Sequence, residues 1–171
     1  LILGLLTPLG GEVQIGGRPL PTYGRRELSR QIALVPQAEH IPFDFSVLEY
    51  VLLGRSPYLG MLEMPGEADY RVAQTALETL GLAALATRPV TELSGGERQM
   101  AALARALAQE AHILLLDEPT SHLDLSNKGR LLQTLQLLAG RGVTIVFTTH
   151  DPEMAVLAAH YLVLMRRGQV I

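Results

Sequence analysis

An α/β fold with a largely parallel sheet is the class that this 171-residue sequence predicts. Short apolar runs of strand length alternate along the chain with longer Ala- and Leu-rich segments of helical periodicity. Residues 113–116 and 143–147 are continuously apolar or β-branched, which is typical of strands covered on both faces. We therefore expect these two runs to be the central strands of a single domain.

The composition excludes several classes of protein. Hydrophobic residues make up 48% of the chain and charged residues 18%, and no stretch approaches the roughly 20 apolar residues of a membrane-spanning helix. A net charge of −3 provides no basic field for phosphate backbones, so nucleic acid is not an expected partner. The absence of cysteine excludes disulfides and is compatible with a reducing compartment, for which the cytoplasm is our expectation.

Shorter strand signals flank the two central runs. Residues 12–15, followed by a Gly-Gly pair, predict a strand that closes in a turn, and residues 32–35, ended by a proline, predict another. Residues 162–165, with Gly168 after them, predict a last strand that turns back on itself.

The pattern becomes helical in the middle of the chain. Ser46 and Glu49 form a capping box that begins a helix toward Leu53. Residues 69–80 carry one apolar stripe and end at a glycine, as an amphipathic helix does. We expect residues 1–37 and 111–171 to form the α/β core and residues 38–110 to form an inserted helical subdomain.

Two carboxylates, Asp117 and Glu118, stand at the end of an apolar strand, where open α/β sheets bind ligands. Asp117 suits Mg²⁺ held through water, since this ion prefers carboxylate and phosphate oxygens and gives up its waters reluctantly. Glu118 is then placed to orient or deprotonate an attacking water. Pro119 is expected to bias Glu118 toward an extended backbone. The alternative is a strand end with two solvated acids.

The run from Ser94 to Glu97 has two interpretations. Ser94 and Glu97 form a capping box, which explains these two residues as a helix start. It does not explain Gly95 and Gly96, because glycine costs about 1 kcal/mol relative to alanine inside a helix. Bare amides at the positive N-terminus of a helix form an anion site, so we expect a phosphate to approach here.

Two further polar residues follow strands of the predicted sheet. His150 comes directly after a strand run and precedes Asp151-Pro152, which predicts an N-cap with proline at the first helical position. Gln37 comes after the strand that ends at residue 35. Each alone is an ordinary loop residue. Beside the two carboxylates at the same sheet edge, His150 becomes a candidate contact for a γ-phosphate.

In their order along the chain, five motifs resemble those of the nucleotide-binding domain of the ABC ATPase family. They are Pro36-Gln37, Leu93-Ser-Gly-Gly-Glu97, Leu116-Asp-Glu-Pro119, Ser121-His-Leu-Asp124 and Thr149-His150. The LSGGE run with an LDEP strand shortly downstream is specific, and the resemblance covers essentially the whole chain. It implies a P-loop NTPase-like, RecA-like α/β fold, in which helices flank a mostly parallel sheet and an α-helical subdomain is inserted.

The resemblance also implies ATP and Mg²⁺ as cofactors and a role for each motif. ATP is contacted by Gln37, Ser94, Gly95, Gly96, Glu97 and Asp124, Mg²⁺ by Asp117 and Gln37, and catalysis involves Glu118 and His150. In the terms of the family, Gln37 is the Q-loop glutamine, residues 94–97 the signature loop, Asp117 the Walker B aspartate, Glu118 the catalytic base, Asp124 the D-loop aspartate and His150 the switch histidine.

The sequence departs from the family at its N-terminus. The family has a phosphate loop, G-x-x-x-x-G-K-[ST], that opens a helix running into the equivalent of residues 1–6, and this sequence has no such loop. The chain also starts at Leu1 without an initiator Met. We therefore expect the N-terminal strands and the phosphate loop to be missing, and the piece alone to be inactive and poorly stable.

By this resemblance the intact protein is the ATPase subunit of an importer on the cytoplasmic face of the cell membrane. The implied partners are a second ABC ATPase subunit paired head to tail, transmembrane permease subunits and, indirectly, a substrate-binding protein. Residues 45–60 look like those of importers for iron-siderophore, haem and cobalamin complexes, whereas residues 148–152 are similar to molybdate-type relatives. Residues 43–58 are the expected permease-docking surface; the alternative is that Phe45, Val47, Leu48 and Val51 pack the subdomain.

Two other functions stay open. A non-transport ABC ATPase of the DNA repair or translation type works by clamping, and such proteins usually carry long coiled coils, a zinc module or a second tandem domain. None of these features appears in the sequence. The other alternative is an inert truncation product, which the interior-looking start keeps open.

Overall fold

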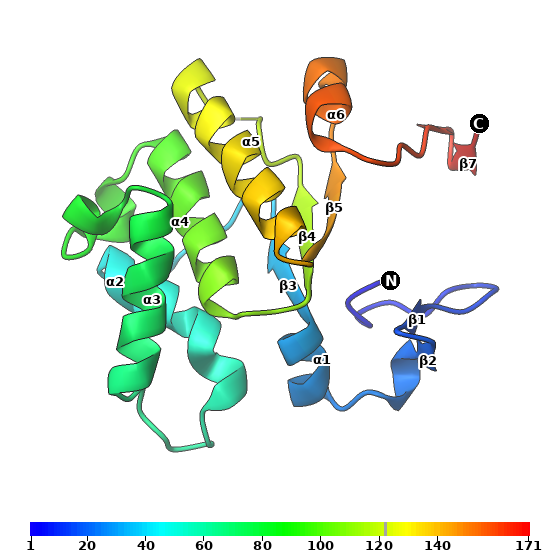
Figure 1. Ribbon diagram of the computed structural model, residues 1–171. Helices are drawn as coiled ribbons and strands as arrows, with labels where there is room; N and C mark the ends of the chain where they lie inside the picture. Colours follow the sequence, from blue (N-terminus) through cyan, green and yellow to red (C-terminus); the bar gives the residue numbers. More distant parts are fainter. Residues whose placement is uncertain (122) are drawn as a thin grey trace.

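The computed structural model describes residues 1–121 and 123–171. Its centre is a parallel sheet in the order β3 (Ile32–Val35), β4 (Ile113–Asp117) and β5 (Thr144–Thr148) (Figure 1). Because β3 and β5 each pair in register with β4, all three strands end at one edge of the sheet. β4 is the central strand, as predicted, whereas β5 is paired on one side only within the described residues.

The two faces of the sheet are buried against different parts of the chain. Ala33 and Leu114 point to the helical layer, where α4 (Gly95–Ala108) packs on β3. Ile32 and Leu115 point to the opposite face and pack against N-terminal residues. This division follows from the pleat, since successive side chains of a strand point to opposite faces.

The prediction that β5 is covered on both faces is wrong. Ile145 and Phe147 pack against the helix-side core, but Val146 on the opposite face is 46% exposed. The N-terminal cluster on that face includes residues of β3 and β4 and, within the part of the chain that the structure describes, none of β5. The run 143–147 is therefore a strand of the predicted length at an edge of the sheet.

The helices between residues 38 and 110 gather on one side of the sheet (Figure 1). They are α2 (Val47–Leu52), η2 (Leu53–Tyr58), α3 (Glu67–Thr79), η3 (Ala83–Leu85), η4 (Val90–Glu92) and α4. The capping box at Ser46 is confirmed, because its Oγ accepts the Glu49 N–H over 3.2 Å. One buried cluster runs from β3 and β4 through these helices, so the division into core and inserted subdomain stays a prediction.

The remaining helices flank the strands. α1 (Arg25–Gln31) leads into β3, and α5 (Leu125–Gly140) lies beside α4 and contacts β5. α6 (Pro152–Ala158) begins at the predicted N-cap, where the Asp151 carboxylate accepts the N–H groups of Glu153 and Met154. None of the helices in the described part of the chain has the length and apolar character needed to cross a bilayer.

Two small hairpins lie near the ends of the chain. β1 (Gln14–Ile15) pairs with β2 (Arg18–Pro19), which leads into η1 (Leu20–Thr22). The predicted turn at Gly16 and Gly17 is confirmed, with φ angles of 57° and 77° that favour glycine. β6 (Met165–Arg166) pairs with β7 (Gln169–Val170), so the last strand does turn back, but it begins later than the predicted residue 162.

Candidate active site

The carboxyl ends of β3, β4 and β5 lie at one edge of the sheet because the strands are parallel and in register. Gln37 follows shortly after β3, Asp117 is the last residue of β4, and His150 follows shortly after β5. Parallel pairing therefore brings together side chains that are far apart in the sequence. The sequence places the candidate residues at this edge, and the sheet makes them neighbours.

Two polar side chains converge on one oxygen of Glu118. Gln37 Nε2 donates to Glu118 Oε2 over 3.1 Å, and His150 Nδ1 lies 3.1 Å from the same oxygen. The Glu118 side chain is 30% exposed and the His150 side chain 75% exposed, so a partly shielded carboxylate faces an imidazole in solvent. These contacts orient a carboxylate that can accept a proton from water.

Sequence reasoning missed Thr148, whose side chain contacts both carboxylate residues. Its hydroxyl donates to Asp117 Oδ1 over 2.6 Å and accepts the Glu118 N–H over 3.0 Å. Thr148 is paired with Asp117 across β4 and β5, so both side chains lie on the same face of the sheet. A hydroxyl residue two positions before His150 was the available signal, but only the register of the strands shows that it lies opposite Asp117.

The backbone of Glu118 corrects one sequence prediction. Its φ is 44°, in the left-handed region, and not the extended conformation predicted from Pro119. The chain turns directly after β4, where the Ser121 N–H donates to the Glu118 carbonyl oxygen over 3.1 Å. Pro119 thus occupies the second position of a tight turn, which proline favours. The turn, and not the restraint from proline alone, sets the Glu118 backbone.

The residues from Ser94 to Glu97 form the first turn of α4 and its N-cap. Glu97 Oε2 accepts the Ser94 N–H over 2.8 Å, and Ser94 Oγ accepts the Glu97 N–H over 3.3 Å, so the capping box is confirmed. The Ser94 hydroxyl, followed by the Ser94 amide, lowers the pKa of the Glu97 carboxyl. Among the described residues, this turn has no hydrogen bond or ion pair to the Glu118 cluster.

Asp124 also lies outside the Glu118 cluster. It is the N-cap of α5, and its carboxylate accepts the Asn127 N–H over 2.8 Å. One turn later, Lys128 Nζ lies 3.1 Å from Asp151 Oδ2, a contact that the sequence did not predict. It links the start of α5 to the loop that carries His150. His122, part of the Ser121–Asp124 motif, lies outside the described residues.

The donor groups at the sheet edge fit an Mg²⁺ ion held largely through water and phosphate. Asp117 is an exposed carboxylate at the end of β4, and the Gln37 amide lies nearby, within hydrogen-bond distance of Glu118. In the described part of the chain, no group of three or more His, Asp or Glu side chains forms a closed metal site. An ion with few protein ligands and several retained waters suits this arrangement.

The predicted docking segment, residues 43–58, divides into a packed part and an exposed part. Val47 and Val51 are fully buried, and Phe45 and Leu48 pack against the same core. The packing interpretation therefore holds for these four residues. Phe43 is 64% exposed and remains available on the surface.

An open groove of about 840 Å³ lies between α1, η2 and the end of α4. Its lining combines apolar side chains, many of them from the segment 53–61, with arginines from α1 and α4. The apolar residues include Leu53, Pro57, Leu59 and Met61, and the arginines are Arg25, Arg26 and Arg105.

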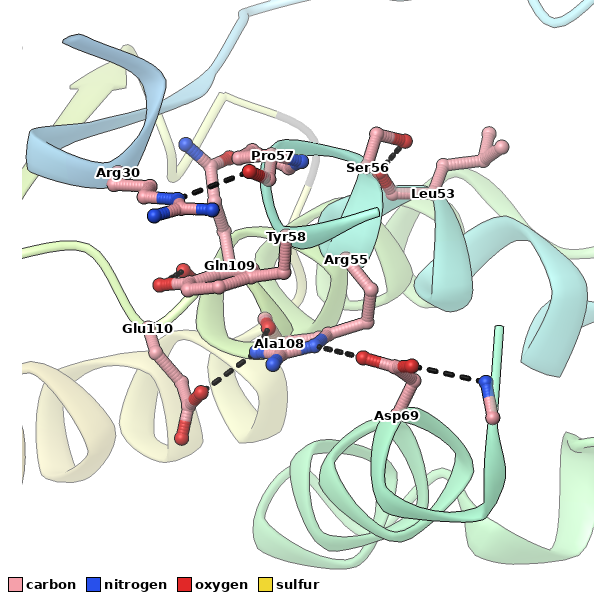
Figure 2. A network of polar contacts seen from close by, with 11 residues as sticks. Arg30, Leu53, Arg55, Ser56, Pro57, Tyr58, Asp69, Ala108, Gln109 and Glu110 are labelled. Carbon is pink, nitrogen blue, oxygen red and sulfur yellow. Dashed lines mark hydrogen bonds and ion pairs between the residues drawn. The ribbon is translucent and has the colours of Figure 1, made fainter. Parts of the chain in front are cut away.

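Arg55 lies on η2, beside this groove, and links η2 to α3 and to the end of α4 (Figure 2). Its side chain is 9% exposed and lies 3.0 Å from Asp69 and 2.6 Å from Glu110. It also donates to the Ala108 carbonyl oxygen over 2.7 Å, and its guanidinium stacks 4.1 Å from the centre of the Tyr58 ring. The hydrogen bond from Arg55 lowers the pKa of the Asp69 carboxyl.

Comparison with known proteins gives consistent matches over most of the chain. A family model described as ABC transporter matches residues 1–121. The chain is 40% identical over 164 residues to an uncharacterized ABC transporter ATP-binding protein of Haemophilus influenzae, covering 96% of the chain and 62% of that relative. It is 44% identical to a molybdate import ATP-binding protein of the same organism, covering 86% of the chain and 58% of the relative.

A third relative, an iron(3+)-hydroxamate import ATP-binding protein of Bacillus subtilis, is 36% identical, and the match covers 94% of the chain and 60% of the relative. The chain thus spans about 60% of the length of the curated relatives it matches.

Solved structures show the same fold. An inward-facing transporter of the metal-chelate ABC type superposes with a TM-score of 0.86 at 39% identity, covering 99% of this chain and 63% of that one. The dimeric structure of a bacterial ABC transporter cassette superposes with a TM-score of 0.76 at 33% identity, covering 90% of this chain and 68% of that one. The predicted P-loop NTPase-like α/β fold is confirmed.

Proposed function

Because the chain belongs to the ABC transporter family of ATP-binding domains, we propose that it forms the ATP-hydrolysing part of an ABC importer. The observation that carries this proposal is the convergence of Gln37 and His150 on Glu118 at the carboxyl edge of a parallel sheet. That edge is where open α/β sheets bind their ligands.

Glu118 is the general base in this proposal. Its carboxylate accepts a proton from the water that attacks the terminal phosphate of ATP, while Gln37 and His150 hold the carboxylate in place. Asp117, with Gln37 beside it, would hold Mg²⁺, which when bound neutralises charge on the phosphates. Phosphoryl transfer depends chiefly on positioning and charge stabilisation, so two contacts of 3.1 Å to one carboxylate oxygen support this role.

The glycine-rich start of α4 is proposed to contact nucleotide bound by a second ABC ATPase subunit. Residues 94–97 stand at the positive end of a 14-residue helix, a position that favours phosphate. Their separation from the Glu118 cluster fits a head-to-tail pair, in which each subunit completes the site of the other. Asp124 is assigned to the same shared interface. The dimeric solved cassette at 33% identity supports this arrangement.

The groove beside η2 is the proposed docking site for a transmembrane permease subunit. Its apolar side chains suit the apolar face of a short helix, and Arg25 and Arg26 of α1 suit acidic side chains on that helix, whereas Arg105 is paired with Glu39 over 2.6 Å. The exposed Phe43 lies in the same predicted docking segment. Docking here would hold the chain at the cytoplasmic face of the membrane, with a substrate-binding protein acting through the permease.

The proposed cargo is a metal chelate. The structural relative of the metal-chelate type and the iron(3+)-hydroxamate relative support this class, as do the residues 45–60. Molybdate is the second candidate, because the molybdate import relative is 44% identical. Uptake of radiolabelled iron chelate and molybdate by cells lacking the gene would separate the two.

The test of the ATPase role uses the full-length gene product, purified with and without its transmembrane permease subunits. We expect membrane-associated ATP hydrolysis that depends on Mg²⁺ and is abolished by Glu118→Gln, while Glu153→Gln on α6 serves as an exposed control. Hydrolysis that survives Glu118→Gln would overturn the assigned base. A protein that does not associate with membranes and whose ATP hydrolysis is stimulated by nucleic acid would favour the non-transport alternative. A folded protein that does not bind nucleotide would favour an inert product.

A further inference from the structure

Thr148 is the one described side chain that contacts both carboxylate residues at the sheet edge. Its Oγ donates to Asp117 Oδ1 over 2.6 Å and accepts the Glu118 N–H over 3.0 Å. A hydroxyl carries one donor and two acceptor lone pairs, so it makes both bonds at once.

The acceptor half of the contact acts on the backbone of Glu118. A non-glycine residue with φ of 44° is in a sparsely populated, strained conformation. Such conformations persist where surrounding contacts hold them in place. Here the Thr148 hydroxyl binds the Glu118 N–H, and the Ser121 N–H binds the Glu118 carbonyl oxygen.

The donor half of the contact acts on the Asp117 side chain. Asp117 and Thr148 are directly opposite each other in the β4–β5 pairing, and both are exposed at the end of their strands. The hydrogen bond selects one orientation of the Asp117 carboxylate. Because both residues are exposed, this bond is no part of the buried core.

We propose that Thr148 is a positioning residue for ATP hydrolysis, with one hydroxyl that orients Asp117 and, through the Glu118 amide, aims the Glu118 carboxylate. The inference rests on the proposed function. It adds a residue of β5 to the site and makes the β4–β5 register part of the catalytic geometry. A one-residue change of that register would separate Thr148 from Asp117.

Three variants of the full-length gene product separate the hydroxyl from the shape of the side chain. Thr148→Val removes the hydroxyl and keeps the β-branched shape, whereas Thr148→Ser keeps the hydroxyl and loses the methyl group. Thr144→Val is the matched control, because Thr144 lies on the same strand and the same face at the opposite end. Its hydroxyl has no hydrogen bond to any described residue.

Two readouts are needed. For ATP hydrolysis, Thr148→Val is expected to lower kcat on the order of tenfold with KM nearly unchanged, because misplaced catalytic groups reduce rate more than binding. For the backbone, the exchange rate of the Glu118 amide proton, measured by NMR without nucleotide, is expected to rise about two- to tenfold. Thr148→Ser should restore both values to near those of the unsubstituted protein, and Thr144→Val should change neither.

The outcomes distinguish this inference from the function on which it rests. Absence of ATP hydrolysis by the unsubstituted protein overturns the proposed function. Hydrolysis that Thr148→Val leaves unchanged overturns the role of Thr148 alone. Equal damage from Thr148→Ser and Thr148→Val, or an unchanged Glu118 amide in Thr148→Val, shows that the hydroxyl does not position these groups.

Discussion

Lys128 Nζ lies 3.1 Å from Asp151 Oδ2, and this ion pair joins the first turns of α5 and α6. Asp151 also accepts the N–H groups of Glu153 and Met154, so one carboxylate caps α6 and holds α5. The Met154 amide, followed by Lys128, lowers the pKa of the Asp151 carboxyl. The loop that carries His150 is thereby tied to the helix that Asp124 begins.

Asp151→Ala is expected to destabilise the protein more than Lys128→Met does. The aspartate variant loses the cap and the ion pair, whereas the lysine variant loses only a pair whose side chains are 39% and 25% exposed. Urea midpoints of the two variants give the order. Asp151→Asn keeps a capping side chain, so its urea midpoint should lie between those of the other two variants. A larger loss of stability from Lys128→Met than from Asp151→Ala would contradict the role given to Asp151.

The stability of the protein should fall on acidification below about pH 4. Asp69, Glu97 and Asp151 all have lowered pKa values in the folded chain, so the unfolded chain binds protons more readily as the pH falls. Their stabilisation is present above the unfolded pKa and is lost as the pH passes down through the folded pKa. Urea midpoints between pH 7 and 3 measure this loss, and a midpoint that rises toward pH 3 would refute it.

Arg55→Met is expected to cost about 2 kcal/mol of unfolding free energy, because it removes the charged partner of a largely shielded carboxylate and the donor to the Ala108 carbonyl oxygen. That carboxylate is Asp69, whose side chain is 14% exposed, whereas Glu110 is 54% exposed and contributes little. Arg71→Met is the matched control: its ion pair with Glu67 is mostly solvent-exposed and should have almost no effect. Chemical denaturation measures the unfolding free energy of both variants. A similar loss from the two substitutions would show that the Arg55 contacts stabilise the protein no more than an exposed ion pair does.

Gly54→Ala and Gly129→Ala should change stability in opposite directions. A Cβ at Gly54 would collide with the Arg105 carbonyl oxygen, where η2 lies against α4, and such overpacking costs about 1–3 kcal/mol. A Cβ at Gly129 meets no atom within 4 Å on the surface of α5, so alanine should add about 0.5–1 kcal/mol there. Thermal melts of the two variants test the sign, and a neutral Gly54→Ala would argue against the close approach.

The 171-residue chain on its own is expected to hydrolyse ATP no faster than the buffer background. Glu118 and His150 are in place, but the chain contains no G-x-x-x-x-G-K-[ST] loop to hold the phosphates. A phosphate-release assay at saturating Mg²⁺ and ATP measures the rate. Robust hydrolysis that Glu118→Gln abolishes would contradict the prediction, whereas hydrolysis insensitive to that substitution would indicate a contaminant.

The local features of the fold were predictable because their determinants lie within a few residues. The caps at Ser46, Ser94 and Asp151 depend on a side chain and an amide up to three positions apart, and all three formed as predicted. Strand β3 matched residues 32–35. The coverage of β5 was not predictable, because an apolar run does not show which segment, if any, lies on each face.

The candidate active site shows the same division between features with local determinants and features that depend on distant residues. By itself the sequence determined that Asp117 and Glu118 end a strand, that Ser94 begins a helix with two glycines, and that the motifs resemble an ABC ATPase. Tertiary structure decided the contacts of Gln37 and His150 with Glu118 and the hydroxyl bonds of Thr148. These depend on the register of parallel strands whose residues are 30 or more positions apart. Long-range register is set by packing of the whole sheet, which no local pattern encodes.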